Sequence, residues 1–350
     1  MAWPGLQTVL DEWTAGARSS LPTYGAALAV YRGGRPHFVG ASGLTPAAIF
    51  PAYSVTKTFT AVALLRLQER GVLALDQTLD HWLPALPWAG DVSLRQLLRH
   101  SAGVPNYSAM PGHQRALRVS PRRAWTFDEF ILHACLGRLD FPPDTSWAYS
   151  NTGYMLLKRV LESSLEAGFG QVLRQHAVDP LALELTRELR SPECYESLTP
   201  GFGRLGESHE LVDVRGGYDP GWCATGVVAS TTTELCRFMV GAFDGTLLSE
   251  ASRREMCEWV PALGVEGPGN PRYGLGLMAR DTPFGLELGH GGSGPGYDIH
   301  LSHFPELEQT RGQSLTVAAM CNSDRPADAS WKLINAVRPV VFEALADFKK

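Results

Sequence analysis

The sequence predicts an α+β fold in which strands from both ends of the chain form one antiparallel sheet. Strand-like runs lie near the N-terminus and again near the C-terminus, whereas the stretch between them has mainly helical patterns. We therefore expect a discontinuous sheet domain formed by residues 1–75 and 265–350. Residues 76–264 are expected to form a mainly helical inserted domain.

Local patterns predict the elements of the N-terminal part in order. A helix is expected over roughly Gly5–Arg18. Two strand-like runs follow, Gly25–Tyr31 and Pro36–Gly40, and the Arg-Gly-Gly-Arg turn between them is typical of a hairpin. From Ser54 the apolar residues recur every three or four positions until Gly71, which predicts a buried helix and its end.

The rest of the chain separates into helical segments and a second group of strands. Helical spacing predicts helices at Leu94–His100, Phe127–Leu136, Gly153–Ser164 and Thr232–Phe243. Alternation with period two predicts strands at Arg272–Arg280, Leu286–Gly289, Tyr297–Phe304 and Ser314–Cys321. An amphipathic helix is expected over about Ala327–Phe348.

Composition excludes several functional classes. The 350 residues are 44% hydrophobic and carry a formal net charge of −5, so the chain has no basic surplus for nucleic acid. We find no run of the roughly 18–20 apolar residues that a membrane span needs. The six cysteines include no C-x-x-C pair and are expected to be reduced thiols.

The start of the chain predicts its compartment. It lacks a basic segment followed by an apolar core, which would mark a secretory signal. We therefore expect a cytoplasmic protein, or a periplasmic or secreted one if the N-terminus has been processed. Nothing in the sequence indicates an oligomeric state.

The first chemical motif is Ser54-Val55-Thr56-Lys57 at the start of the predicted helix. Residues three apart share a helix face, so a lysine there reaches the serine hydroxyl. Such a lysine activates the hydroxyl if burial lowers its pKa. Because S-x-x-K arises by chance about 0.3 times in a chain of this composition, the motif alone also fits a serine helix cap beside an exposed lysine.

The second motif is Tyr149-Ser150-Asn151, in a loop that leads into a helix. Tyr149 can act as a general base if neighbouring donors depress its pKa from about 10. Asn151 offers an amide that orients a substrate carbonyl or holds Lys57. The structural alternative makes Tyr149 a buried aromatic and Asn151 the helix cap.

The third motif, His290-Gly291-Gly292-Ser293, follows a predicted strand. Small residues let a substrate lie along the strand edge and hydrogen-bond its backbone. The glycines here also satisfy G-x-G-x-x-G, but the Pro295-Gly296 that follows is incompatible with the helix of a dinucleotide site. His300 and His303 point to opposite faces of a strand, so we predict no metal and no cofactor.

Taken in this order, the three motifs resemble those of the serine β-lactamase and penicillin-binding protein superfamily. The chain is most similar to the branch with class C β-lactamases, D-alanyl-D-alanine carboxypeptidases, D-aminopeptidases and β-lactamase-like carboxylesterases. The likeness extends over nearly the whole chain and includes the segments LRQLLRHSAGVPNY, YSNTGYMLLKRVLE and TGVVASTTTELCRFM. It implies a β-lactamase/transpeptidase-like fold, with a five-stranded antiparallel sheet flanked by helices and an active site in the cleft beside the inserted helical domain.

The resemblance also implies roles for individual residues. Ser54 would be the acylated nucleophile, with Lys57 sharing its proton and Tyr149 as general base. Asn151 would bind the substrate amide or carbonyl. The oxyanion hole would consist of the backbone N–H groups of Ser54 and Ser293.

One departure from the family pattern bears on the substrate. The third motif commonly reads Lys-Thr-Gly or Lys-Ser-Gly, whose cation and hydroxyl help to hold a substrate carboxylate. In this chain His290, Gly291 and Gly292 occupy these positions, so an imidazole with an ordinary pKa near 6.5 replaces the permanent charge. We therefore expect weak β-lactamase activity at best and better turnover of small esters, amides or D-amino-acid peptides.

The sequence leaves several functional hypotheses open. The leading one is a cofactor-independent serine hydrolase that acts through an acyl-enzyme on a small ester, amide or β-lactam and reuses Tyr149 and Lys57 in deacylation. The alternatives are a non-hydrolysing penicillin-binding or sensor module, which acylates without turnover, and an inactive scaffold. Four aromatic residues are candidates for lining an acyl pocket: Tyr107, Trp147, Trp222 and Tyr297.

Overall fold

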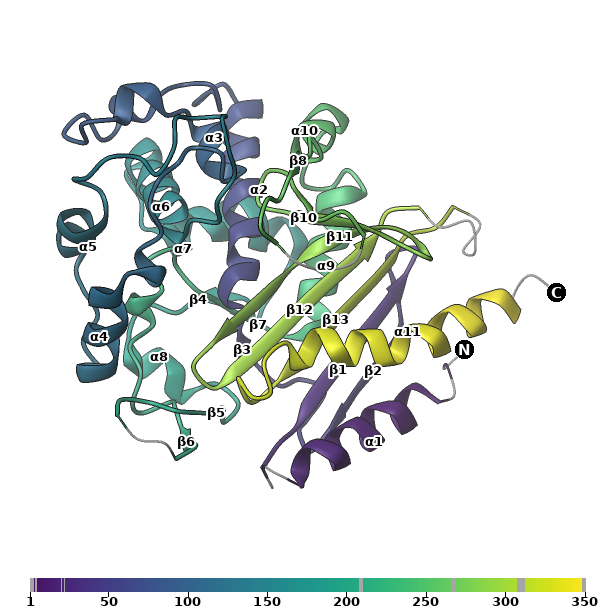
Figure 1. Ribbon diagram of the computed structural model, residues 1–350. Coiled ribbons are helices and arrows are strands. Elements are labelled where there is room, and N and C mark those ends of the chain that lie inside the picture. Colours follow the sequence, from purple (N-terminus) through teal and green to yellow (C-terminus); the bar gives the residue numbers. More distant parts are fainter. Residues whose placement is uncertain are drawn as a thin grey trace.

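The computed structural model centres on an eight-stranded antiparallel sheet (Figure 1). The structure describes residues 3, 5–19, 21, 23–207, 210–265, 269–306 and 312–347. The strand order is β2-β1-β13-β12-β11-β10-β9-β8. In chain order the strands are β1 (Ala26–Arg32), β2 (Arg35–Ser42), β8 (Val260–Pro261), β9 (Arg272–Tyr273), β10 (Met278–Thr282), β11 (Gly285–Gly294), β12 (Tyr297–Phe304) and β13 (Leu315–Cys321).

The predicted α+β class and family fold are confirmed, but the expectation of five strands is wrong. Two of the additional strands, β8 and β9, are two-residue strands at one edge. The segment 272–280, which the alternation predicts as one strand, is divided between β9 and β10. Gly276 causes this break, because its φ of +68° belongs to a turn and its Cα packs against the Lys57 carbonyl.

Helices cover both faces of the sheet (Figure 1). On one face α1 (Leu6–Arg18) and α11 (Ala329–Asp347) pack in a core of their own with strands β1, β12 and β13. On the other face α2 (Thr56–Glu69) and α9 (Thr232–Phe243) join the main core. The rings of Phe59 and Phe238 stack between these two helices.

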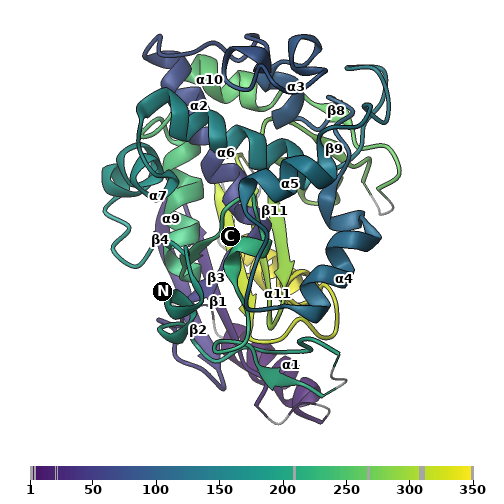
Figure 2. The ribbon, with the colours of Figure 1, turned by 90° about the vertical axis from the view of Figure 1, so that its left-hand side faces the viewer.

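Helix α2 is buried almost all round, because it lies between the sheet and the remaining helices (Figure 2). Those helices are α3 (Leu94–Leu98), α4 (Pro111–Val119), α5 (Phe127–Ala134), α6 (Asn151–Leu165), α7 (Phe169–Leu173), α8 (Pro192–Glu196) and α10 (Glu250–Met256). Two small sheets lie among them, formed by β3 (Phe50–Pro51), β7 (Val228–Ser230) and β4 (Arg187–Glu188), and by β5 (Phe202–Gly203) and β6 (Val212–Asp213).

The two-domain division stays a prediction. Helix α9 lies within 76–264, yet it packs against β1 and β13 of the large sheet. Among the described residues no helix is both long and apolar enough to cross a membrane. All six cysteines are free thiols.

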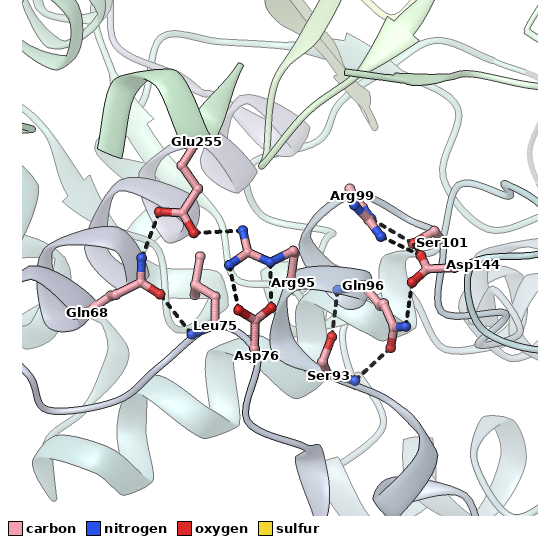
Figure 3. A network of polar contacts seen from close by, with 10 residues as sticks. All are labelled: Gln68, Leu75, Asp76, Ser93, Arg95, Gln96, Arg99, Ser101, Asp144 and Glu255. Carbon is pink, nitrogen blue, oxygen red and sulfur yellow. Dashed lines mark hydrogen bonds and ion pairs between the residues drawn. The ribbon is translucent and has the colours of Figure 1, made fainter. Parts of the chain in front are cut away.

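A polar network holds α3 and the loop before α6 in place (Figure 3). Arg95 binds Glu255 of α10 at 2.6 Å. Arg99 and the hydroxyl of Ser101 each donate to the Asp144 carboxylate at 2.6 Å. Because Asp144 begins the segment that carries the second motif, these bonds tie that segment to the end of α3.

Candidate active site

Ser54 lies at the entrance of α2, in a short 3-10 turn formed by Tyr53–Val55. Two hydrogen bonds made by the residues on either side of this turn fasten it to β7. The Ala52 N–H donates to the Val228 carbonyl at 2.6 Å, and the Val228 N–H donates to the Thr56 hydroxyl at 3.0 Å. Ser54 is half-buried.

Lys57 contacts Ser54 directly, as the spacing predicts. Its Nζ donates to Ser54 Oγ at 3.0 Å and to Asn151 Oδ1 at 2.7 Å, although residues 57 and 151 are far apart in sequence. The side chain is only 1% exposed, and both partners are neutral. Burial therefore lowers the Lys57 pKa to about 7, so a large fraction of the amine is unprotonated near neutral pH.

Tyr149 completes this cluster. Lys57 Nζ lies 4.9 Å from the centre of its ring. Burial raises the Tyr149 pKa above its ordinary value, and the nearby Ser54 side chain lowers it by less. The depressed pKa that was the condition for Tyr149 to act as general base is therefore not found. Tyr149 is thus a neutral phenol, and Lys57 is the group of the pair that is free to accept a proton.

Asn151 holds Lys57 rather than capping the helix. The cap of α6 is Ser150, whose hydroxyl accepts from the Gly153 N–H at 3.2 Å. The Asn151 Nδ2 donates to Ser108 Oγ at 2.9 Å, so Oδ1 is oriented toward Lys57. The sequence allowed the Asn151 amide either to orient a substrate carbonyl or to hold Lys57, and this geometry matches the second role.

The third motif lies on β11 opposite Ser54. Strand β10 pairs with β11 only as far as Gly289, so within the described part of the chain no strand pairs with residues 290–294 on that side. Gly292 packs against the turn of the nucleophile, because a Cβ there would lie 2.4 Å from the Ala52 carbonyl oxygen and 3.1 Å from the Ser54 nitrogen. Ser293 is exposed next to it. The backbone N–H groups of Ser54 and Ser293 therefore belong to adjacent segments beside an open strand edge.

His290 is neutral, which corrects the expectation of a group titrating near pH 6.5. The side chain is 1% exposed, and burial together with the nearby Lys57 lowers its pKa to about 3. Its Nδ1 lies 2.6 Å from the Gly291 carbonyl, which only accepts, so Nδ1 carries the hydrogen. The Nε2 then accepts from the Tyr273 hydroxyl at 2.9 Å.

His100 is a site residue that the sequence analysis assigned no role. Its Nδ1 accepts from the Ser150 N–H and its carbonyl accepts from the Ala148 N–H, both at 3.1 Å, so it holds the residues on either side of Tyr149. Its ring centre lies 4.4 Å from that of Tyr149. The signal was present in the segment LRHSAGVPN, which the family resemblance includes.

Ser108 and Asn106 were also missed. The Asn106 side-chain oxygen accepts from the Asn151 N–H at 3.1 Å and from the Ser108 hydroxyl at 3.0 Å. Asn106 therefore holds the backbone of Asn151, and Ser108 holds the nitrogen end of its side-chain amide. An Asn-x-Ser turn after a Gly-x-Pro loop was the available signal.

The aromatic candidates for the acyl pocket divide into two groups. Trp147 lines a mostly apolar pocket of about 120 Å³ together with Tyr273, Met278 and His290. Three others are buried in the main core, namely Tyr107, Trp222 and Tyr297.

These observations agree with comparisons to known proteins. The family model described as Beta-lactamase matches residues 11–337. The chain belongs to the beta-lactamase family. A crystal structure of a D-stereospecific amidohydrolase from Streptomyces sp. superposes with a TM-score of 0.80 at 27% identity, covering 95% of this chain and 98% of that one.

Two curated proteins extend this comparison. A penicillin-binding protein of Bacillus subtilis (strain 168) is 24% identical over 84% of this chain and 65% of its own length. Esterase EstB of Burkholderia gladioli is 34% identical over 39% of this chain and 36% of its own length. The chain thus matches between about a third and two thirds of the length of these curated relatives.

Proposed function

We propose that the protein is a cofactor-independent serine hydrolase that forms an acyl-enzyme on Ser54. The observation that carries this proposal is the 3.0 Å hydrogen bond between Ser54 Oγ and a buried Lys57 whose pKa is lowered to about 7. A serine hydroxyl becomes a nucleophile when an adjacent base accepts its proton, and a partly unprotonated amine in contact with it is such a base.

In the acylation step the Ser54 oxygen attacks the substrate carbonyl carbon while its proton moves to Lys57. The carbonyl electron pair moves onto oxygen, and the N–H groups of Ser54 and Ser293 stabilise the resulting oxyanion. When the intermediate collapses, the proton passes to the departing alkoxide or amine. Tyr149 serves as the relay, donating its phenolic proton to the leaving group and receiving the one held by Lys57.

Deacylation uses the same groups with water in place of the leaving group. Lys57 is neutral again once the leaving group has taken the proton, so it accepts a proton from water through Tyr149. Hydroxide forms at the acyl carbon, and the Ser54 oxygen recovers its proton as the acid departs. This step requires no carboxylate as an additional base.

The substrate class follows from the charge at His290. Because this imidazole is neutral, the site lacks the cation that binds the carboxylate of penicillins. The substrates favoured are therefore small esters, amides or D-amino-acid derivatives without that carboxylate, with β-lactams hydrolysed slowly. The names of an esterase and a D-stereospecific amidohydrolase among the related proteins support this class.

The second candidate is a penicillin-binding or sensor module that acylates without turnover, and the name of the Bacillus relative supports it. The two candidates differ only in the fate of the acyl-enzyme. Mass spectrometry after mixing with excess p-nitrophenyl acetate separates them. A hydrolase returns to its free mass once the ester is consumed, whereas a sensor keeps an added acetyl group on Ser54.

A substrate panel tests the leading proposal. It contains p-nitrophenyl esters, D- and L-amino-acid p-nitroanilides and nitrocefin, each assayed with the parent chain and with Ser54→Ala. We expect turnover of an ester or a D-anilide that falls by at least about 10³-fold in the variant. The matched control is Ser164→Ala, which removes a hydroxyl bonded to Trp82 and leaves activity unchanged. Full activity of Ser54→Ala would mean that another nucleophile acts.

A further inference from the structure

Tyr53, the residue before the nucleophile, connects Ser54 to the end of β11. Its backbone has a φ of +42°, an uncommon conformation for a residue with a side chain. This conformation allows the buried ring to reach the β11–β12 turn, where its hydroxyl donates to the Pro295 carbonyl at 2.8 Å. The acceptor lies two residues beyond Ser293.

The tip of β11 also rests directly on the Tyr53 ring. A Cβ at Gly294 would lie 2.4 Å from the nearest ring carbon, so only glycine allows this approach. A Cβ at Gly292 would likewise lie 2.4 Å from the Ala52 carbonyl oxygen. The strand therefore touches the nucleophile turn on both sides of Ser293, and the hydrogen bond from Tyr53 closes the contact.

A second buried hydroxyl supports the first. Tyr195 Oη donates to Tyr53 Oη at 3.4 Å, which leaves the Tyr53 hydrogen directed at Pro295. Burial, with the neighbouring Tyr195 and Tyr218, raises the Tyr53 pKa well above 10. The hydroxyl thus stays protonated and remains a donor at any pH at which the protein works.

We propose that the Tyr53 hydroxyl is a positioning group for the oxyanion hole. Tyr53 is the residue directly before Ser54, and its hydroxyl binds Pro295, two residues after Ser293. The hydrogen bond therefore fixes the distance between the N–H groups of Ser54 and Ser293. The proposal rests on the proposed function, because it assigns these two N–H groups to the oxyanion. The donors of an oxyanion hole stabilise the transition state because they are held in place before the negative charge develops. Loosening one donor therefore reduces stabilisation of the transition state more than binding of the substrate.

The substitution Tyr53→Phe tests the proposal, because it removes one oxygen and keeps the ring under Gly294. On the best ester of the panel we expect kcat to fall about 10-fold and KM to stay within about twofold. The Kd of phenylboronic acid, which forms a tetrahedral adduct with a catalytic serine, should rise by a similar factor of about 10. Gly294→Ala, whose methyl group meets the Tyr53 ring, should lower kcat further.

Tyr297→Phe is the matched control. Tyr297 is equally buried and its hydroxyl also donates to a backbone carbonyl, that of Thr199 at 2.7 Å. It should lower the melting temperature about as much as Tyr53→Phe while leaving kcat and boronate affinity within about twofold.

The outcomes separate this proposal from the proposed function. Unchanged kcat and boronate affinity in Tyr53→Phe overturn the positioning role, and so does an equal loss of kcat in Tyr297→Phe, which would indicate a purely structural effect. Full activity of Ser54→Ala overturns the proposed function instead.

Discussion

The two elements beside Ser54, helix α2 and strand β11, contain one buried base each, and burial affects the two bases differently. Lys57 on α2 and His290 on β11 are both about 1% exposed, and burial lowers both pKa values. Lys57 begins from 10.5 and reaches about 7, where it exchanges protons readily. His290 begins from 6.5 and reaches about 3, where it stays neutral. Burial therefore activates a lysine and removes the charge of a histidine.

This contrast divides the proposed work between two segments. Helix α2 and the turn before it carry the proposed nucleophile and base. Strand β11 supplies an open strand edge, with glycines that let it approach Ser54 closely.

The largest effect is expected from Lys57→Met, which removes the base and keeps the volume. We expect kcat/KM to fall by about 10⁴-fold, because acylation and deacylation both lose their proton acceptor. Steady-state assays on the best panel substrate measure this. Lys158→Met is the control, since that lysine is bound only weakly to Glu188 at 3.9 Å and should leave the rate unchanged.

The same variant should be more stable than the parent chain. Unfolded lysine keeps its proton up to about pH 10.4, whereas folded Lys57 releases it near pH 7, so burial of this amine costs stability below about pH 10. We expect Lys57→Met to raise the free energy of unfolding at pH 7 by roughly 2–4 kcal/mol. A lower urea midpoint would contradict this explanation.

A somewhat smaller effect is expected from Asn151→Asp, which exchanges a neutral partner of Lys57 for a carboxylate of the same shape. An opposite charge in contact raises a lysine pKa by about 1–3 units. At pH 7 we expect kcat/KM to fall about 30-fold, with most of it recovered near pH 9 as Lys57 loses its proton. A uniform loss across the pH range would mean that Asn151 acts on the substrate instead.

The pH profile of the unmodified protein should show a single ascending limb. Protonated Lys57 cannot accept the Ser54 proton, so kcat/KM should fall about tenfold per unit below about pH 7 and level off above it. His290 should add no inflection between about pH 5 and 9, because its pKa lies near 3. A second inflection near pH 6.5 that disappears in His290→Asn would show that the imidazole titrates after all.

The smallest effect concerns His290→Lys, which restores the common residue of the third motif. Its ammonium would be buried near Lys57, so its pKa is lowered too and its charge is only partial near neutral pH. We expect kcat/KM for nitrocefin to rise about fivefold at pH 6 and by less at pH 8. The absence of any gain at pH 6 would remove charge as the reason for weak β-lactam turnover.

The sequence predicted the local parts of this site better than the distant ones. The contact of Ser54 with Lys57 follows from helical spacing. The bond from Lys57 to Asn151 was one of two roles that the Asn151 amide allowed, and the family resemblance implied the other one, substrate binding. The neutral state of His290 was beyond prediction, because it depends on burial of the imidazole and on the nearby Lys57, and both result from tertiary packing. The backbone conformation of Tyr53 could not be predicted from the sequence either, since a positive φ at a tyrosine results from packing and not from the preference of the residue.

The proposed mechanism depends on a Lys57 amine that, in the folded protein, loses its proton near neutral pH. A ¹³C NMR titration of lysine Cε resonances measures this directly, and with only five lysines in the chain the Lys57 signal can be assigned by its loss in Lys57→Met. We expect the Lys57 signal to titrate with a midpoint near pH 7. A Lys57 midpoint above about pH 9 would contradict it.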